Sequence, residues 1–378
     1  MIPVNAPLVP SEAHAYVLDC LDTGWISSAG KYLGEFESKF AQYVQCRHAV
    51  AVCNGTVSLH LALAALDIGP GDEVIVPAHT IISCLDAILY VGAIPVIVDV
   101  EPDIYTLDPA QLEQACSPRT KVIMPVHIFG HPADMDPINE FAGRHGLFVI
   151  EDAAEAHGAT YKGKTCGALG HVGSFSFYAN KLITTGEGGM VVTNDDALAD
   201  RMRQQKDLCH MPGLRFHHDR LGFNYRMTNL QAALGCAQML HAKEYLERKQ
   251  RMGSRYTQGL ADVRGLVAPQ VRAGASSSYW MYAVRITPDA GMTRDEFCAR
   301  LKDRGVDTRD FFWSLSEQPL LKKTTAHVLP CPVSERIARE GCYLPSGLAL
   351  TDDEIDRVIA EVREVLGGAI PTTAGHRQ

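Results

Sequence analysis

The sequence of 378 residues lacks the cysteine pairs, the basic runs and the long apolar runs that mark several common protein classes. Its eleven cysteines stand singly with no CxxC pair, so neither a zinc motif nor a dithiol redox motif has support. The net charge of −9 argues against a general nucleic-acid binder, which needs a basic surface. No apolar run reaches the roughly 18 residues that a membrane helix needs.

The start of the chain and its composition indicate a cytoplasmic globular protein. Residues 1–5 show no basic stretch followed by an apolar core, so we expect no signal peptide. The unpatterned cysteines suggest reduced thiols, and we expect neither membrane nor nucleic-acid partners. A chain that is 46% hydrophobic and 21% charged can bury a sizeable core, and its length suits two domains or one large α/β domain with an appendage.

Short apolar runs alternate with amphipathic runs over the first two-thirds of the chain. This pattern predicts a mainly parallel sheet covered by helices on both faces. We expect a long helix over 229–251 to lead from a large domain (1–240) into a smaller C-terminal α/β domain (241–378). The expected strands are 48–53, 73–77, 94–98, 121–126, 147–151, 174–178, 190–193 and 278–286, and the other expected helices are 57–66, 81–90, 137–145, 294–304 and 352–366.

Polar motifs follow several of these strands, at the edge where open α/β sheets bind ligands. Asn54, Gly55 and Thr56 begin a helix, where N–H groups and a hydroxyl can hold a phosphate, although an ordinary helix N-cap explains them more simply. Asp152 ends a buried strand. A carboxylate there can keep a pyridine nitrogen protonated, or it can form a salt bridge or cap the next segment.

The motif SFSFYANK, residues 174–181, runs from a strand into a turn and ends in Lys181. Desolvation lowers the pKa of a lysine among apolar neighbours and frees its amine for Schiff-base chemistry. Ser176 can offer its hydroxyl to a cofactor phosphate. A surface lysine at a hairpin is the commoner case, and the polar loop GFNYRMTN at 222–229 could be an ordinary N-cap. The four polar motifs, at 54–56, 151–152, 174–181 and 222–229, occur together after successive strands, and this favours a cofactor site at Lys181.

Together these residues resemble the DegT/StrS family of nucleotide-sugar aminotransferases, which are fold-type I enzymes that use pyridoxal 5'-phosphate (PLP). The resemblance extends from Trp25 to Pro345 and is most specific in the runs GDEVIVP (71–77), ITTGEGGM (183–190) and NYRMTN (224–229). The phrase NKxITTGEGG is most similar to the branch that aminates C4 of a 4-keto-6-deoxy sugar. The implied fold is a mainly parallel central sheet with a smaller C-terminal α/β domain.

The resemblance implies a role for each matching residue. Lys181 is the catalytic residue, which forms the Schiff base and moves the proton. Asp152 pairs with the ring nitrogen of PLP and Glu155 with its hydroxyl, while the other implied contacts come from Gly55, Thr56 and Ser176 at the phosphate, Ile81 at the ring face and Asn224 at the phosphate of a neighbouring subunit. The implied substrate-binding residues are Trp25, Ser27 and Arg226.

The same resemblance implies the partners. L-glutamate donates the amino group, a nucleotide-linked keto-sugar accepts it, and the enzyme is a homodimer with active sites shared across subunits. Two positions depart from the family pattern and bear on the sugar. Ile81 follows Thr80 where the family has an aromatic residue that adds about 0.5–1.5 kcal/mol of stacking, and Ser316 stands where the C4 branch tends to have histidine. A 3-keto sugar or an aminocyclitol ketone is the alternative acceptor.

Three other functions are weighed against this one. The pairs His127/His131 and His217/His218 suggest a metal hydrolase, but His127 and His131 do not share a face as they would on a helix. We therefore expect no metal, and we expect His127 to line the cofactor pocket. A PLP-binding regulatory protein would keep the lysine but has no DNA-binding module here. Sugar dehydratases of this family replace the lysine with histidine.

Overall fold

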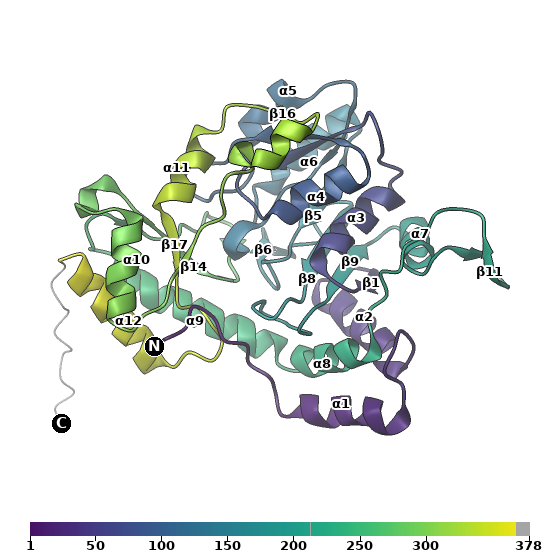
Figure 1. Cartoon of the computed structure of the whole chain (residues 1–378), viewed down its shortest axis with the longest axis horizontal. Coiled ribbons are helices and arrows are strands. Elements are labelled where there is room, and N and C mark those ends of the chain that lie inside the picture. The colour runs from purple at the N-terminus through teal and green to yellow at the C-terminus, as the bar shows by residue number, and fades with distance from the viewer. Residues whose placement is uncertain (212, 368–378) are drawn as a thin grey trace.

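The computed structural model describes residues 1–211 and 213–367, and it shows an α/β protein built around an eight-stranded sheet (Figure 1). The strand order is β1-β9-β8-β5-β4-β2-β3-β16. Neighbouring strands pair in parallel except at β9, which runs against both β1 and β8. The predicted mainly parallel sheet is thus confirmed. Its strands are β1 (His48–Val52), β2 (Glu73–Pro77), β3 (Ile94–Val98), β4 (Thr120–Ile123), β5 (Phe148–Asp152), β8 (Val172–Ser176), β9 (Gly189–Thr193) and β16 (His327–Val328).

Helices cover both faces of this sheet, as its apolar strands require. Val74 and Val76 of β2 pack into the hydrophobic cluster that contains α3, whereas Ile75 between them packs into a cluster on the other face. No described helix is long and apolar enough to cross a membrane. The helices of this part are α1 (Glu12–Thr23), α2 (Lys31–Tyr43), α3 (Gly55–Ala65), α4 (Ile82–Tyr90), α5 (Leu112–Ala115), α6 (Met135–His145), α7 (Asp196–Lys206) and α8 (Asn229–Met239).

A second, antiparallel sheet in the order β12-β14-β17-β15 lies in the C-terminal part, with α9, α10 and α12 near it in Figure 1. The N-terminal Ile2 joins the hydrophobic cluster of this part, and β16 pairs with β3 of the large sheet. The boundary at residue 240 stays a prediction, and residues 368–378 of the expected small domain lie outside the described residues. The elements are α9 (Ala242–Leu260), β12 (Leu266–Val267), β14 (Tyr282–Ile286), α10 (Arg294–Asp303), β15 (Arg309–Asp310), α11 (Pro332–Glu340), β17 (Gly341–Leu344) and α12 (Asp352–Val365).

Short elements complete the described fold. The hairpin of β10 and β11 projects from the body beside α7 (Figure 1). The remaining strands are β6 (Thr160–Tyr161), β7 (Lys164–Thr165), β10 (His210–Met211), β11 (Leu214–His218) and β13 (Ala275–Ser276), and the 3-10 helices are η1 (Pro109–Gln111), η2 (Ile128–Gly130), η3 (Pro288–Ala290), η4 (Leu315–Glu317) and η5 (Pro319–Lys323).

Three expected elements are wrong in their extent. The strand expected over 121–126 ends at Ile123. The single helix over 229–251 is two helices, because the chain turns at Leu240 and His241, between α8 and α9. The strand expected over 278–286 begins only at Tyr282. Residues 278–281 are held by groups from elsewhere: the N–H of Ser278 donates to the carbonyl of Gly130 at 3.0 Å, and Lys249 Nζ donates to the carbonyl of Trp280 at 2.8 Å.

Strand β8 separates an aromatic core from a polar face, because successive side chains of a strand point to opposite sides. Phe175 packs on Phe40 of α2 with ring centroids 4.9 Å apart, and Phe177, just after the strand, packs on the same ring at 5.1 Å. Ser174 points the other way and bonds Ser58 of α3. The aromatic core thus fixes how far β8 reaches toward α3.

We predict that Phe40→Ala lowers the free energy of unfolding by about 3–5 kcal/mol, since it leaves a cavity where a fully buried ring was. Urea unfolding followed by circular dichroism measures the change. Val271→Ala is the control: its side chain is 40% exposed, so the change should stay within about 0.5 kcal/mol. Equal losses in the two variants would contradict the packing role of Phe40.

Candidate active site

A cavity of about 810 Å³ opens at the carboxyl ends of the parallel strands. The turn after β1, the end of β5 and the end of β8 form one wall, and residues of the C-terminal part form the other. Its polar lining residues are Cys53, Asn54, Thr56, Ser83, Tyr90, Asp152, Glu155, Ser176, Tyr178, Asn180, Lys181, Glu187, Arg309, Asp310 and Tyr343, and its apolar or glycine lining residues are Gly55, Val57, Leu59, Ile81, Ala154, Trp280, Met281 and Phe312.

Lys181 extends into this cavity from the turn that follows β8, and its side chain is 10% exposed. Its Nζ lies 3.6 Å from Oε1 of Glu155 and 4.1 Å from the centroid of the Trp280 ring. The indole N–H of Trp280 donates to the carbonyl of Asn180 at 3.0 Å, which fixes the ring. The amine is therefore held between a carboxylate and an aromatic face.

Two buried carboxylates line the cavity beside the lysine. Asp152 Oδ2 accepts a hydrogen bond from the thiol of Cys84 at 3.0 Å, and Oδ1 accepts one from the N–H of Ala154 at 3.0 Å. Glu155 accepts one from the N–H of Phe129 at 2.7 Å, and burial raises its pKa to about 7 even though the charge of Lys181 opposes the rise. No cation pairs with Asp152 among the described residues.

The start of α3 forms a cradle for an anion. Asn54 caps the helix by accepting from the N–H of Val57 at 3.0 Å, and the N–H groups of Gly55 and Thr56 lie in the first turn, where they have no intrahelical acceptor. A Cβ built on Gly55 would lie 2.8 Å from Cβ of Ser176, so only glycine lets the two walls approach. The Thr56 hydroxyl donates to Ser83 Oγ at 2.9 Å. N–H groups and hydroxyls therefore converge as a phosphate group requires.

These features fit the cofactor that the resemblance implies. A buried carboxylate without a cation is costly, and a protonated ring nitrogen would offset that cost at Asp152. The helix start offers a phosphate site, Ile81 lines the cavity just before α4, and Lys181 offers the amine. The structure thus brings together seven of the predicted site residues, which are Gly55, Thr56, Ile81, Asp152, Glu155, Ser176 and Lys181.

The four other predicted residues do not line this cavity. Trp25 and Ser27 are exposed, and their carbonyls accept hydrogen bonds from Asn229 at 2.7 Å and 2.5 Å. Asn224 is exposed as well, and Arg226 pairs with Asp207. Their roles toward the phosphate and the substrate stay predictions.

The expectation that His127 lines the pocket is wrong. Its ring is fully buried behind the site, where Nε2 bonds Glu151 at 2.8 Å and Nδ1 accepts from the N–H of Ala133 at 3.0 Å. Glu151 is therefore structural, although it precedes Asp152 in the sequence. His131 also has both ring nitrogens bonded. Within the described ranges, no group of three or more His, Cys, Asp or Glu residues is placed to hold a metal.

Several residues that line the cavity or contact its lining carry no local sequence signal. Trp280 belongs to a run that alternates like a strand, and nothing local shows that its ring covers a lysine 99 positions earlier. Cys84 lies on the inner face of α4, where it resembles any core cysteine. Arg309 and Tyr343 come from β15 and β17 of the small sheet, whose docking onto the large one has no local signal.

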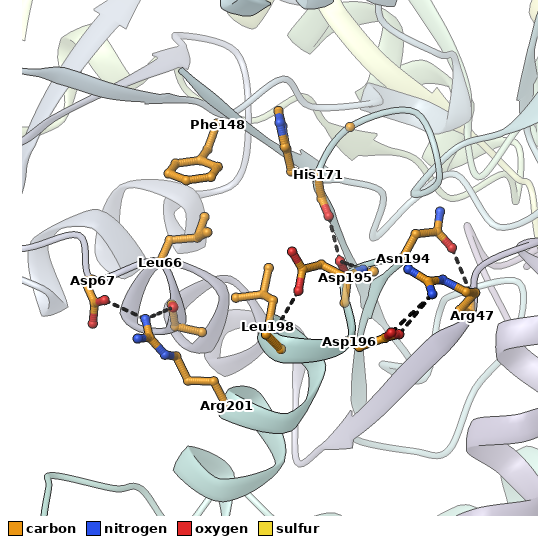
Figure 2. Close-up of a pocket in the computed structure, with 14 residues that line it drawn as sticks. Arg47, Leu66, Asp67, Phe148, His171, Asn194, Asp195, Asp196, Leu198 and Arg201 are labelled. Carbon is orange, nitrogen blue, oxygen red and sulfur yellow. Dashed lines mark hydrogen bonds and ion pairs between the residues drawn. The ribbon is translucent and has the colours of Figure 1, made fainter. Parts of the chain in front are cut away.

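A second cavity of about 850 Å³ lies at the opposite edge of the sheet, where β5 and β8 begin (Figure 2). Its charged groups are already engaged. Asp67 pairs with Arg201 at 2.5 Å, Asp196 pairs with Arg47 at 3.1 Å, and Asp195 caps α7. This cavity therefore lacks the converging unpaired groups of the first one.

Comparison with known proteins identifies the family to which the chain belongs. The DegT/DnrJ/EryC1/StrS aminotransferase family matches residues 8–363. The GDP-perosamine synthase of Caulobacter vibrioides is 46% identical over 97% of this chain and 98% of its own. The structure of S. venezuelae DesV is 37% identical, with a TM-score of 0.89 over 96% of this chain and 100% of that one. The PLP form of a putative sugar aminotransferase, Spr1654 from Streptococcus pneumoniae, is 27% identical, with a TM-score of 0.90 over 97% and 98%.

The predicted aminotransferase class and fold type are thereby confirmed over the regulatory and metal-hydrolase alternatives. The family match covers nearly the whole chain. One cavity of this chain also brings together a lysine, two carboxylates and the start of a helix. The chain belongs to the DegT/DnrJ/EryC1/StrS family of PLP-dependent aminotransferases.

Proposed function

We propose that this enzyme transfers the amino group of L-glutamate to C4 of a GDP-linked 4-keto-6-deoxy sugar, with PLP held at Lys181. The observation that carries the proposal is the cavity itself, in which Lys181, Asp152 and the start of α3 converge. The 46% identity to a GDP-perosamine synthase supports the sugar. All eleven cysteines are unpaired, which fits the reducing cytoplasm, where we place the enzyme.

Each residue of the site then has a definite task. PLP, when bound, supplies a carbonyl that takes up the amino group and a ring that delocalises the electrons released at the substrate carbon. Asp152 would hold the ring nitrogen in its protonated form, Glu155 would interact with the ring hydroxyl, and Gly55, Thr56 and Ser176 would hold the phosphate. Lys181 Nζ takes the proton from Cα of the donor and, in the second half of the reaction, delivers a proton to C4 of the sugar.

A homodimer with shared sites is part of this proposal. Large apolar side chains are exposed around the turn after α1 and along the segment that holds β10 and β11: Trp25 is 58% exposed and Leu221 is 79% exposed. Exposed apolar groups within one short segment, such as Leu214 and Leu221, indicate a protein interface. Asn224, which is exposed and lies outside its own cavity, would then reach the phosphate in the partner's cavity.

We predict that the wild-type holoenzyme releases 2-oxoglutarate from L-glutamate when a GDP-linked 4-keto-6-deoxy sugar is added. Lys181→Ala should lose at least about 100-fold in rate, because it loses the group that moves the proton. Borohydride should fix the cofactor on a peptide that contains Lys181. Lys164→Ala, which changes an exposed lysine, is the control and should behave as wild type. Turnover only with a 3-keto sugar or a cyclitol ketone would replace the proposed acceptor.

We predict that Glu155→Gln stabilises the cofactor-free protein more at pH 7.5 than at pH 5. The pKa of Glu155 in the folded protein is raised from 4.5 to about 7, so the folded state binds the proton more tightly than the unfolded state. Wild-type stability therefore falls as the pH rises from about 4.5 to about 7, by on the order of 3 kcal/mol. The variant lacks this titration. Urea unfolding at both pH values measures the difference, and a pH-independent difference would refute the assignment.

We predict that mixed dimers of Asn224→Ala and Lys181→Ala recover activity that neither homodimer shows. One cavity of such a dimer would combine an intact Lys181 with an intact partner Asn224. Co-expression with two affinity tags isolates the mixed dimers, and turnover per dimer should approach half of the wild-type value if the sites act independently. Mixed dimers that stay as inactive as the homodimers would argue against a shared site.

A further inference from the structure

The cavity has few cationic side chains, and they differ in whether a carboxylate lies beside them. Among the described residues that line it, only Lys181 and Arg309 carry positive charge. Lys181 faces Glu155 and reacts with the cofactor. Arg309 is exposed and has no carboxylate within ion-pair distance in the described chain. A guanidinium beside a reactive site that lacks an acidic partner is free to bind an anionic ligand.

The acids nearest to Arg309 are already engaged. Asp310, its neighbour in β15, pairs with Arg294 at 3.0 Å. Glu155 accepts from the N–H of Phe129 and faces Lys181. Glu187 lines the cavity from the loop before β9 and brings a negative charge rather than a second cation. Within one subunit, Arg309 is thus the one described lining cation besides Lys181 that could bind an incoming carboxylate.

The backbone holds Arg309 firmly although its side chain is exposed. In β15, Arg309 pairs with Tyr343 of β17, and the N–H of Phe311 donates to the carbonyl of Gly341 at 3.2 Å. Tyr343 packs edge-on against Trp280 with ring centroids 5.9 Å apart, and Trp280 covers Lys181. Two aromatic side chains therefore connect the strand of Arg309 to the reacting nitrogen.

Tyr343 adds an independent observation at the same place. It is 1% exposed, and its hydroxyl is buried without a hydrogen-bond partner, although a buried hydroxyl normally has one. Burial and the charge of Glu155 raise the pKa of this hydroxyl, while Arg309 lowers it, so the three groups interact electrostatically. An anion bound by Arg309 would give the Tyr343 hydroxyl an acceptor.

We propose that Arg309 binds a carboxylate of the amino donor. This inference rests on the proposed function, which makes L-glutamate the donor. Glutamate must bring two carboxylates into the cavity, and the planar fork of arginine binds a carboxylate through two hydrogen bonds. The diphosphate of a nucleotide sugar lies beyond the sugar ring, and therefore further from the reacting nitrogen than either carboxylate of the donor.

The two half-reactions separate the donor from the sugar. PLP-loaded protein is mixed rapidly with L-glutamate, and the loss of the bound-PLP absorbance gives the half-saturating concentration. Arg309→Gln should raise that concentration about 10- to 100-fold, the usual range for a lost hydrogen bond to a charged group. Arg309→Lys keeps the charge without the fork and should lie between Arg309→Gln and wild type. Titration with α-methyl-L-glutamate, which lacks the proton to be removed, should show the same order in binding alone.

The second half-reaction and a matched variant are the controls. Pyridoxamine-phosphate-loaded Arg309→Gln should react with the GDP-linked 4-keto-6-deoxy sugar as wild type does. Arg300→Gln makes the same charge change on the exposed face of α10 and should leave both half-reactions unchanged. If Arg309→Gln fails to fold, as judged by loss of PLP absorbance, the intermediate effect of Arg309→Lys tests the proposal.

Two outcomes would overturn the assignment of Arg309 and leave the proposed function standing. One is an unchanged half-saturating glutamate concentration in Arg309→Gln. The other is a defect confined to the sugar half-reaction, which would assign Arg309 to the diphosphate instead. A wild-type holoenzyme that does not react with L-glutamate at all would contradict the proposed donor, and the assignment of Arg309 with it.

Discussion

The site depends on one electrostatic constraint, which is the burial of Asp152 without a cation in the described protein. A carboxylate that is 4% exposed costs free energy unless a positive charge or several donors offset the lost water. Here only a thiol and one backbone N–H donate to it. Strand β5 is central in the sheet, so Asp152 cannot move out to solvent. The fold therefore holds a carboxylate in a place where a cationic ligand, such as the proposed cofactor ring, would stabilise it.

The rest of the site is positioned by β8, whose side chains point alternately to the two faces of the sheet. Phe175 and Phe177 anchor β8 and its end to the aromatic core on α2, and this anchoring determines how far Ser174 and Ser176 reach toward α3. Because Gly55 has no side chain, the start of α3 can lie against Ser176. The turn that follows β8 then places Lys181 at the edge of the sheet, in the same cavity. Core packing on one face of β8 thus sets the geometry of the phosphate cradle on the other.

Sequence reasoning could place the groups that follow strands but not those that come from the second sheet. Gly55, Asp152, Ser176 and Lys181 each follow an apolar run, and parallel strands bring their carboxyl ends to one edge. Trp280 and Arg309 reach that edge only because the C-terminal sheet docks there, which no local periodicity encodes. The break between α8 and α9 had no glycine or proline to mark it. It follows from the two helices packing on different hydrophobic clusters.

In the proposed reaction one site serves two unlike substrates in turn, and the charges in the cavity suit this demand. A dicarboxylate donor needs a cation close to the reacting nitrogen, whereas a keto-sugar presents no charge there and carries its diphosphate further out. An arginine that is exposed and unpaired within the described chain, on a strand fixed by Tyr343, suits both demands. It can bind the donor and then return to solvent at little cost, since an exposed guanidinium stays hydrated. A buried arginine would have left an uncompensated charge facing the neutral ketone.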